Sequence, residues 1–343
     1  MRTGVVGAGH MGQYHILVYA ELWDVDLVGL VDVDASVVSR LAAQYDTQGF
    51  TDYRDLFGKV DVVSIAVPTP LHFEVARDFM EAGIHVLIEK PLTPTLDEAR
   101  ELFRIARQQN VVLHVGHVER FNGAVQELRK IVVNPILIES RRLGPFVPRV
   151  QGDTVIMDLM IHDIDIVLGL VDAEIHGLTA MGTRVQSARP DVANIQIIFE
   201  NGTLANITAS RATEQKIRTL AITQPDAYIF LNYADQDIQI HRRAASEYIL
   251  NRESIRYRQE SFVEHLFVHK ENPLKLELVH LIGAVREAQR TGRVELSEHD
   301  DVRSLGVALA IERMLSEGQT HLPWPPPRSA CAPAAAAPDA SAG

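Results

Sequence analysis

A glycine-rich segment near the start of the chain, Gly7-Ala8-Gly9-His10-Met11-Gly12, constrains the fold more than any other feature. It follows the short apolar run Thr3–Val6 and precedes a stretch of helical character. In such a strand–turn–helix unit the first glycine permits a tight turn, and the second lets the backbone approach a pyrophosphate. The third lets helix and strand pack closely, and the helix N-terminus offers N–H groups to the phosphate. The segment predicts a dinucleotide-binding domain of the Rossmann type. Cofactor contacts are expected from Gly7, Gly9, His10, Met11 and Gly12.

An acidic residue further along the chain supports this interpretation. Asp32 ends the second predicted strand, twenty residues beyond Gly12. An acid at this spacing accepts a hydrogen bond from the ribose 2′-hydroxyl and repels a 2′-phosphate. The next residue is Val33 and not an arginine that could hold such a phosphate. We therefore expect NAD as the cofactor in preference to NADP, with a plain loop acid as the alternative.

Residues 1–121 alternate β-rich apolar runs with stretches of helical spacing. Helical spacing is clearest from Leu96 to Ala106, and Thr95 with Glu98 three residues later forms a capping box at its start. Apolar strands that alternate with helices are typical of a parallel sheet covered on both faces. The prediction is an α/β Rossmann domain over residues 1–121 with a doubly wound parallel sheet. Its strands are expected at Gly4–Val6, Leu27–Val31, Val62–Val67, His85–Ile88 and Val111–Val115.

The pattern changes after Asn122, where residues 173–241 are mostly extended. Asn201-Gly202 between two apolar runs predicts a hairpin with a type I′ turn, which needs positive φ at both central residues. We expect residues 122–322 to form an α+β domain with an open-faced, largely antiparallel sheet. The Pro/Ala-rich residues 323–343 are expected to be disordered. Other predicted elements are helices at Ala124–Ile131, Leu159–Gly169, Pro273–Arg290 and Asp300–Glu317, and a strand at Ile136–Arg142.

Composition narrows the class of protein. The chain has 343 residues, of which 33 are basic and 45 acidic, so its formal charge is −12. Nucleic-acid binding needs a basic footprint and is not expected. The single cysteine, Cys331, excludes an intrachain disulfide, and no apolar run reaches membrane-spanning length. No signal peptide is recognisable, so a cytoplasmic enzyme without a metal is expected.

The tripeptide Glu89-Lys90-Pro91 ends the predicted strand His85–Ile88. Open α/β sheets bind their ligands at the carboxyl ends of the strands, which makes Lys90 a candidate for the active site. A lysine that is partly buried, or near a cationic nicotinamide ring, loses its proton more easily than usual. An ordinary surface lysine is the alternative.

Asp158 and His162 are four residues apart, so on a helix they share a face, with Asp165 further along it. A histidine held by a carboxylate has a fixed tautomer and can accept a proton. The alternative is that these polar groups cap and solvate a helix. Whether Lys90 or His162 takes the substrate proton stays open.

Three arginines, Arg141, Arg142 and Arg149, form a local basic group in an acidic chain. Guanidinium groups bind a diphosphate with paired donors, so this group suits a phosphorylated ligand. A solvated strand edge is the alternative.

Together these segments resemble the Gfo/Idh/MocA oxidoreductases from residue 1 to about residue 320. The resemblance implies a Rossmann domain followed by an open-faced sheet domain that usually mediates oligomer formation. It implies that Lys90, Asp158 and His162 are catalytic. One departure is that Asp153-Thr154-Val155 stands where many members have three glycines, and Met160 replaces a further glycine. The matching segments are the Gly7 loop, Ala66–His72, Glu89–Pro91, Gly116–Asn122 and Asp158 with His162. The nicotinamide side is expected to be lined by Pro68, Thr69, His72, Glu89 and Lys90.

Within the family, the segments Val118–Asn122, Glu139–Pro145 and Leu159–Asp165 are most similar to the sugar-nucleotide 3-dehydrogenases. Those enzymes oxidise the 3-hydroxyl of a UDP-N-acetylglucosamine-type sugar on the way to amino sugars or lipid A. The alternatives are a dehydrogenase of a free sugar or inositol, and an NAD-binding sensor without turnover. The resemblance also implies a homo-oligomer, a dimer or tetramer. Substrate contacts are expected from Lys90, Arg120, Asn122, Arg141, Arg142, His162 and Asp165.

Overall fold

The computed structural model describes residues 1–147, 153–243 and 261–324. The described residues form two compact units, one from Met1–Phe121 with Asn272–Ala310, the other from Asn122–Glu271 with residues 311–324. Both C-terminal helices were expected in the second domain. Instead, Asn272–Ala310 returns to the first unit, because Leu278 of its long helix shares a buried apolar cluster with Tyr19.

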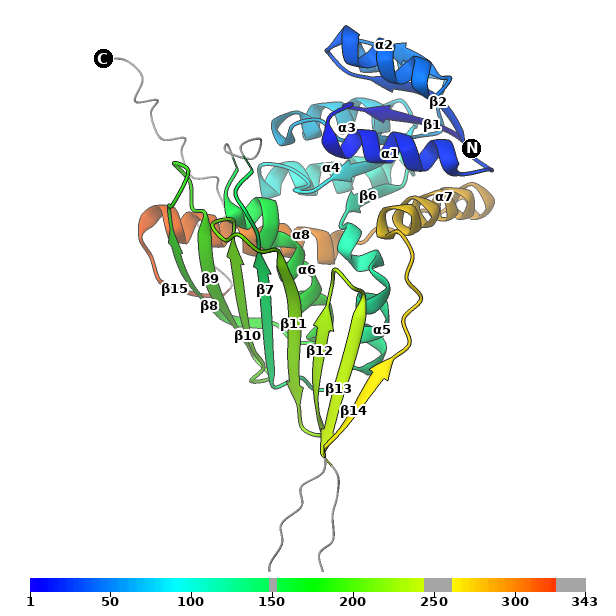
Figure 1. Cartoon of the computed structure of the whole chain (residues 1–343). Helices are drawn as coiled ribbons and strands as arrows, with labels where there is room; N and C mark the ends of the chain where they lie inside the picture. Colours follow the sequence, from blue (N-terminus) through cyan, green and yellow to red (C-terminus); the bar gives the residue numbers. More distant parts are fainter. Residues whose placement is uncertain (148–152, 244–260, 325–343) are drawn as a thin grey trace, which may run out of the picture. The chain divides into compact units, whose positions relative to one another are not determined.

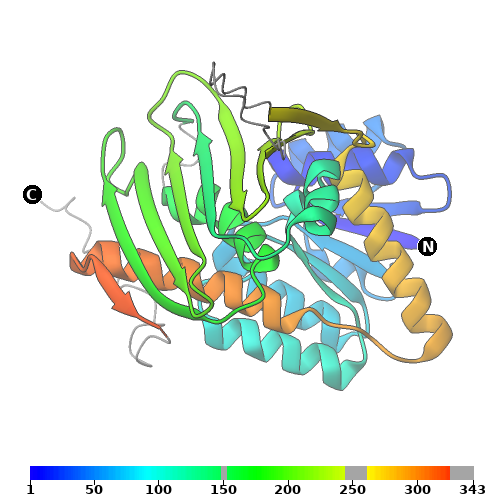
Figure 2. The same ribbon diagram turned by 90° about the horizontal axis from the view of Figure 1, so that it is seen from below.

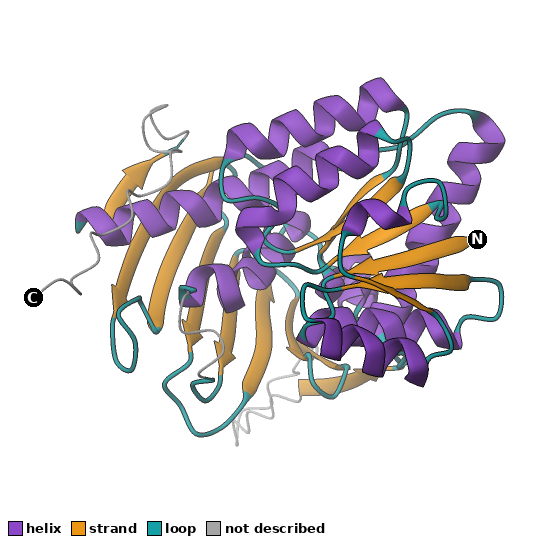
Figure 3. Cartoon of the chain, turned by 90° about the horizontal axis from the view of Figure 1, so that it is seen from above, coloured by secondary structure: helices purple, strands orange, loops and turns teal. Residues whose placement is uncertain are grey.

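The first unit contains a six-stranded sheet with the order β3-β2-β1-β4-β5-β6, and all neighbouring pairs are parallel (Figure 1). This order confirms the predicted Rossmann fold, in which ligands bind where the order reverses, between β1 and β4. Helices cover both faces of the sheet (Figure 3). The strands are β1 (Arg2–Val6), β2 (Asp26–Val31), β3 (Gln48–Phe50), β4 (Val62–Ile65), β5 (His85–Glu89) and β6 (Leu113–Gly116). The helices are α1 (His10–Glu21), α2 (Ala35–Gln44), α3 (His72–Glu81), α4 (Leu96–Gln109) and α7 (Pro273–Thr291), with the start of α8 (Glu298–Glu317).

Two local features of this unit bear on the prediction. Helix α4 begins as expected, since the Glu98 amide donates to Thr95 Oγ1 at 3.2 Å and the Thr95 hydroxyl donates to the Glu98 carboxylate at 3.0 Å.

Strand β3 was not predicted. It has three residues, includes Gly49 and pairs with β2 alone at the sheet edge, so it lacks the apolar run by which buried strands are recognised.

The second unit contains a nine-stranded sheet with the order β14-β13-β12-β11-β7-β10-β9-β8-β15. Strands β7 and β10 are parallel and the other neighbours are antiparallel, which confirms the predicted, largely antiparallel sheet. The strands are β7 (Leu137–Leu143), β8 (Ile175–Thr183), β9 (Val192–Phe199), β10 (Leu204–Ser210), β11 (Ile217–Gln224), β12 (Ala227–Asn232), β13 (Asp237–Arg243), β14 (Ser261–Leu266) and β15 (His321–Pro323).

Helices α5 (Gly123–Ile131) and α6 (Ile161–Leu170) pack on this sheet (Figures 1 and 2). Along β7 buried Ile138, Ser140 and Arg142 alternate with exposed Glu139 and Arg141. This alternation is typical of an antiparallel sheet with one face on the core and the other exposed. Within the residues that the structure describes, no helix is long and apolar enough to cross a membrane.

The hairpin at Asn201-Gly202 is present, but the predicted type I′ turn is wrong. Strands β9 and β10 are joined by residues 200–203, where Gly202 has a positive φ of 86° but Asn201 does not have a positive φ. The Asn201 side chain instead accepts a hydrogen bond from the Thr203 amide at 3.0 Å. Asparagine commonly makes such a bond two residues along the chain, and here it replaces the expected backbone geometry.

Candidate active site

The glycine loop has the geometry that a dinucleotide site requires. Gly7 has φ of +92°, and a Cβ atom there would lie 2.6 Å from the Ala66 carbonyl oxygen. A Cβ atom on Gly12 would lie 1.8 Å from the Gly7 oxygen, so both positions exclude a side chain. At Gly9, by contrast, a Cβ atom would meet nothing within 4 Å among the described residues. Because Gly9 precedes helix α1, this open space lies at a helix N-terminus, where N–H groups attract phosphate.

Asp32 is placed against this loop. Its carboxylate accepts hydrogen bonds from the amides of Ala8 at 2.7 Å and Asp34 at 3.0 Å. A carboxylate offers about four acceptor positions, so these two bonds leave capacity for a ribose hydroxyl. The loop and Asp32 therefore fit an NAD molecule, with the pyrophosphate at Gly9 and the ribose at Asp32.

The segment after β4 was expected to line the nicotinamide side. Pro68 is exposed and Thr69 is half-buried, but His72 has only 1% exposure. The two ring nitrogens of His72 lie 2.8 Å from the Val67 oxygen and 3.0 Å from the Pro91 oxygen. His72 thus joins the segment after β4 to the segment after β5, a positioning role that differs from the expected place beside the nicotinamide.

Lys90 directly follows β5, whose five residues are all buried, and is itself half-buried. The Lys90–Pro91 peptide bond is cis. The neighbouring Glu89 is 7% exposed, and its Oε1 lies 2.7 Å from His15 Nε2 on helix α1. Glu89 was expected to contact the cofactor. Its carboxylate instead bonds to buried His15 inside the first unit.

His15 belongs to a buried polar group that was not predicted. Its Nδ1 lies 3.0 Å from Ser64 Oγ, and the Tyr19 hydroxyl lies 2.9 Å from the same oxygen. Burial by itself would raise the pKa of Glu89, but the hydrogen bond and the charge of His15, and after them the charge of Lys90, hold it below its ordinary value. Burial raises the pKa of Tyr19. The available signal was the spacing of Gly12, His15 and Tyr19, which puts two polar residues on the strand-facing side of α1.

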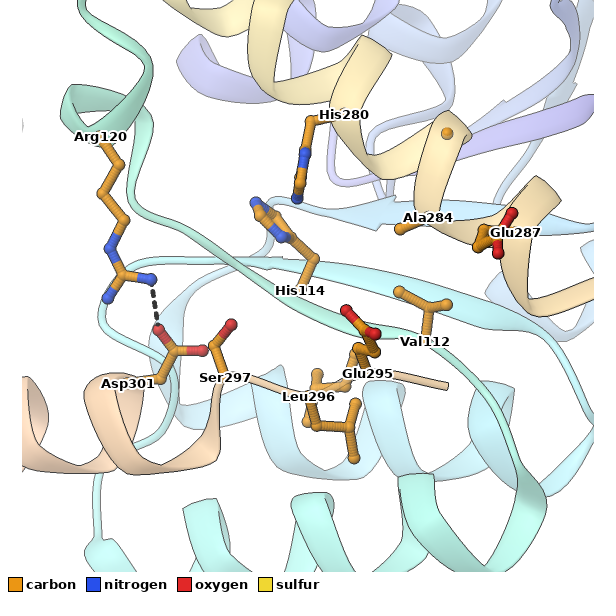
Figure 4. Close-up of a pocket in the computed structure, with 12 residues that line it drawn as sticks. Val112, His114, Arg120, His280, Ala284, Glu287, Glu295, Leu296, Ser297 and Asp301 are labelled. Carbon is orange, nitrogen blue, oxygen red and sulfur yellow. Dashed lines mark ion pairs between the residues drawn. The ribbon is translucent and has the colours of Figure 1, made fainter. Parts of the chain in front are cut away.

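Arg120, expected to bind substrate, forms an ion pair of 2.8 Å with Asp301 (Figure 4). Both residues line a pocket of about 570 Å³ within the first unit, together with His114 and His280. His114 Nε2 lies 3.3 Å from Glu277 Oε1. Burial lowers the pKa of His114 to about 4 and raises that of Glu277 well above its ordinary value.

Asp158 and His162 lie in the second unit, both half-buried. Asp158 is in a π-helical turn, Ile156–Met160, and His162 is in the first turn of α6. The sequence predicted a regular helix here. Single π-helical turns occur frequently at functional sites, so the irregularity at Asp158 is consistent with a functional role. Asp165, four per cent exposed, is buried on α6.

The predicted arginine group does not stay together, because successive residues of β7 point to opposite faces of the sheet. Arg141 is exposed, whereas Arg142 is 2% exposed and its Nε lies 2.5 Å from Asp163 Oδ2. The Arg142 guanidinium also packs over the Tyr233 ring at 5.1 Å. Arg142 is thus held inside the unit, while Arg149 lies outside the described residues. Asp163, its partner, was not predicted.

Asn122 was also expected to contact substrate. It caps helix α5, where its Oδ1 accepts from the Ala124 amide at 3.1 Å. Its Nδ2 donates to the Tyr233 oxygen at 3.1 Å, and the residue is 4% exposed. Both polar ends of the side chain are therefore used within the second unit.

Comparison with known proteins agrees with this geometry. Residues 1–117 match the model of the Gfo/Idh/MocA oxidoreductase family, NAD-binding Rossmann fold, and residues 123–228 match the Gfo/Idh/MocA C-terminal domain. A UDP-N-acetylglucosamine 3-dehydrogenase of Acidithiobacillus ferrooxidans is 39% identical over 246 residues, which cover 71% of this chain and 78% of the relative.

Solved structures show the same relationship. A structure of UDP-N-acetylglucosamine 3-dehydrogenase from Acidithiobacillus ferrooxidans has a TM-score of 0.82 at 33% identity, over 92% of this chain and 98% of that one. A levoglucosan dehydrogenase in complex with NADH and L-sorbose shares the fold, with a TM-score of 0.77 at 20% identity over 95% and 99% of the two chains. The chain belongs to the Gfo/Idh/MocA family of NAD-binding oxidoreductases.

Proposed function

We propose that this protein is an NAD-dependent dehydrogenase that oxidises the 3-hydroxyl of UDP-N-acetylglucosamine or a closely related UDP-sugar. The observation that carries the proposal is the arrangement at the carboxyl edge of the first sheet. There the open space at Gly9, the carboxylate of Asp32 and the side chain of Lys90 follow β1, β2 and β5. The choice of sugar is supported by the 39% identity to a UDP-N-acetylglucosamine 3-dehydrogenase.

The chain would hold NAD through the glycine loop and Asp32, and bound NAD⁺ would supply the hydride acceptor. The protein must then keep the sugar carbon at near-attack distance from the nicotinamide and exclude water. Lys90, at the end of β5, is the residue of this edge that we assign to the reacting oxygen. The preference for NAD follows from Asp32, which would repel a 2′-phosphate.

We assign proton removal to His162, with Asp158 orienting its ring, and a hydrogen bond to the developing carbonyl oxygen to Lys90. The reverse assignment gives the proton to Lys90. Lys90 and His162 belong to different units of the chain, so their action on one substrate is part of the proposal. Arg141, exposed on β7, is the candidate for the diphosphate, whereas the burial of Arg142 argues for a structural role.

We further propose a homo-oligomer, a dimer or tetramer, built on the exposed face of the nine-stranded sheet, and a cytoplasmic location. The support is the alternation along β7 and the 40% exposure of Tyr228 on β12. Light scattering coupled to size-exclusion chromatography measures the oligomer size. A monomer at micromolar concentration would contradict this part of the proposal.

The activity is tested by incubating the protein with NAD⁺ or NADP⁺ and, in turn, UDP-N-acetylglucosamine, myo-inositol and free hexoses. We expect the absorbance of NADH to rise with the UDP-sugar and NAD⁺. Lys90→Ala and His162→Ala should each lower turnover by about 10²–10⁴-fold, the usual contribution of a positioned proton-transfer group. Both variants should still bind NAD, as measured by calorimetry.

Three results would contradict the proposal. Turnover of inositol or a free hexose in preference to the UDP-sugar would change the substrate. A clear preference for NADP⁺ would contradict the role of Asp32. Near-normal turnover in both variants would contradict the mechanism.

A further inference from the structure

Residues 153–155 lead into the π-helical turn that contains Asp158, and each of the three is hydrogen-bonded to a different part of the second unit. The partners come from the residue after β10, from helix α8 and from the loop before β9. They are Arg211, whose Nη2 donates to the Asp153 oxygen at 2.7 Å, Glu312, which accepts from the Thr154 hydroxyl, and Pro190, whose oxygen accepts from the Val155 amide at 3.0 Å. All of these residues belong to the second unit, so their geometry does not depend on the first.

Thr154 also bonds the turn itself. Its Oγ1 accepts a hydrogen bond from the Met157 amide at 3.2 Å, and its carbonyl oxygen accepts one from the Asp158 amide at 3.0 Å. A hydroxyl has one donor and two acceptor positions, so Thr154 bonds the Met157 amide and the Glu312 carboxylate at the same time. Threonine commonly uses such a bond to satisfy an amide that lacks a partner at the start of a helix. Thr154 and Glu312 are both half-buried, so their hydrogen bond is stronger than one in water.

The turn is of an unusual type that needs support from its surroundings. The Ile161 amide donates to the Ile156 oxygen, five residues back, and Asp158 lies between them. Turns of this π type are rare, and an unusual backbone persists only where the surrounding structure holds it. If the turn relaxed to hydrogen bonds that span four residues, Asp158 would point in a different direction relative to His162. The contacts of Thr154 at the start of the turn oppose this relaxation.

We propose that Thr154 and Glu312 are positioning residues of the active site. The bond between them fixes the start of the π-helical turn and, through it, the direction of the Asp158 carboxylate. This inference rests on the proposed function, which assigns Asp158 to the orientation of His162. Loss of the bond slows the reaction, because a misplacement of about 1 Å that arises far from the chemistry can lower the rate by about 10²-fold.

Thr154→Val tests the bond, since it removes the hydroxyl but keeps the branching of the side chain. We expect kcat with UDP-N-acetylglucosamine to fall by about 10–10²-fold, while KM for the sugar and for NAD⁺ stays close to that of the wild type. Thr154→Ser keeps the hydroxyl and should restore most of the turnover. Equal kcat in the wild type and Thr154→Val would overturn the inference.

A second pair of variants reaches the same bond from helix α8. Glu312→Leu removes the acceptor and should lower kcat to a similar extent, whereas Glu312→Gln keeps an acceptor oxygen and should retain turnover. This pair keeps the inference testable if Thr154→Val does not fold, which circular dichroism would reveal. Equal turnover in Glu312→Leu and Glu312→Gln would count against the inference.

Thr203→Val is the matched control for a general loss of stability. Thr203 is 2% exposed, and its hydroxyl donates to the Pro135 oxygen at 2.6 Å in the same unit, at the opposite end of β10 from Arg211. Its substitution should lower the midpoint of denaturation but leave kcat unchanged. If Thr203→Val lowers kcat as much as Thr154→Val, the effect is one of stability and the inference is wrong.

Coupling to Asp158 separates a positioning role from a structural one. If Thr154 acts through Asp158, the two substitutions are not additive. The combination of Thr154→Val with Asp158→Asn should then have the same kcat as Asp158→Asn alone. Independent losses that multiply in the double variant would overturn the inference.

Hydrogen exchange gives a readout that needs no turnover. Mass spectrometry of a peptide that spans residues 155–162 should show faster exchange in Thr154→Val and Glu312→Leu than in the wild type or Thr203→Val, because the turn opens more easily. Unchanged exchange would overturn the inference. If the wild type oxidises no sugar, the proposed function fails, while exchange still decides whether Thr154 and Glu312 hold the turn. If the wild type is active and Thr154→Val keeps its kcat, the inference fails and the proposed function stands.

Discussion

The glycines of the nucleotide-binding loop have different physical reasons to lack a side chain. At Gly12 the reason lies inside the protein, because a methyl group would lie 1.8 Å from the Gly7 oxygen. At Gly9 the surroundings among the described residues leave a methyl group room. The need for glycine at Gly9 must then come from a ligand, which is the inference that connects this residue to a pyrophosphate.

This contrast gives a matched pair of variants. Gly12→Ala should lower the free energy of unfolding, by roughly 1–3 kcal/mol as for other overpacked sites, and also weaken NAD binding. Gly9→Ala should leave the unfolding free energy within about 0.5 kcal/mol of wild type and weaken NAD binding alone. Denaturant titration and calorimetry measure the two quantities. If Gly9→Ala binds NAD normally, the pyrophosphate does not approach Gly9.

At the scale of elements, strand β7 and helix α6 are joined by a buried ion pair between Arg142 and Asp163. Ser140 on the same strand adds a hydrogen bond of 2.7 Å to Asp163. Removing one member of such a pair leaves a buried charge without compensation. The pair thus fixes the position of helix α6 along strand β7.

Asp163→Ala should lower the free energy of unfolding by about 3–5 kcal/mol, as expected for a broken buried pair. Arg141→Ala, next to Arg142 but on the exposed face of β7, should change it by less than about 0.5 kcal/mol. Urea titration of both variants measures the difference. Similar stability in the two variants would show that the pair is not buried in solution.

Asp191 is another buried carboxylate of the second unit, and it makes the free energy of unfolding depend on pH. Burial by itself would raise the pKa of Asp191, but hydrogen bonds from the amides of Val185, Gln186 and Ser187 hold it well below its ordinary value. Arg211 Nε lies 2.9 Å from the same side chain. A depressed folded-state pKa contributes stability that is present above the unfolded value, about 3.9, and is lost as the pH falls toward the folded value.

We therefore expect the free energy of unfolding to decrease as the pH falls below about 4, with a shallower decrease in Asp191→Asn. Denaturant titrations between neutral and acid pH measure the two slopes. Parallel slopes in wild type and Asp191→Asn would contradict the assignment. Above pH 4 the variant should already be less stable, because Arg211 has lost its charged partner.

At the scale of the whole molecule, the chain leaves the first unit at Phe121 and returns to it at Asn272. The returning helix α7 buries Leu278, Leu281 and Val285 in the cluster that contains Tyr19 of α1. The unit that carries the glycine loop is therefore incomplete without residues from near the C-terminus. The first unit is therefore not a continuous segment of the chain.

The return predicts an effect of a distant residue on cofactor binding. Leu278 is fully buried on α7, and Leu278→Ala should lower the unfolding free energy by about 2–5 kcal/mol and reduce the temperature at which NAD binding is lost. Val279, the next residue, is 48% exposed, so Val279→Ala is the control and should have little effect. A thermal scan with bound NAD monitors both. Equal behaviour of the two variants would contradict the placement of α7 in the first core.

The sequence by itself determined the features that depend on local pattern. Apolar runs, helical spacing and the Gly7 loop were sufficient to predict a parallel Rossmann sheet, the following antiparallel sheet and the position of Lys90 at a strand end. These features depend on side-chain periodicity and on the steric requirements of a tight turn. Both signals lie in residues that are close together in the sequence.

The tertiary structure decided which polar groups meet. Nothing in the local pattern indicates that Arg142 pairs with Asp163, that His15 reaches Glu89, or that α7 returns to the first core. Such contacts join residues far apart in the chain, and each depends on burial, which removes water as the competing partner. Glu89 shows both contributions, since its place at the end of β5 follows from the apolar run before it, whereas its buried partner His15 lies on helix α1, 74 residues earlier in the chain.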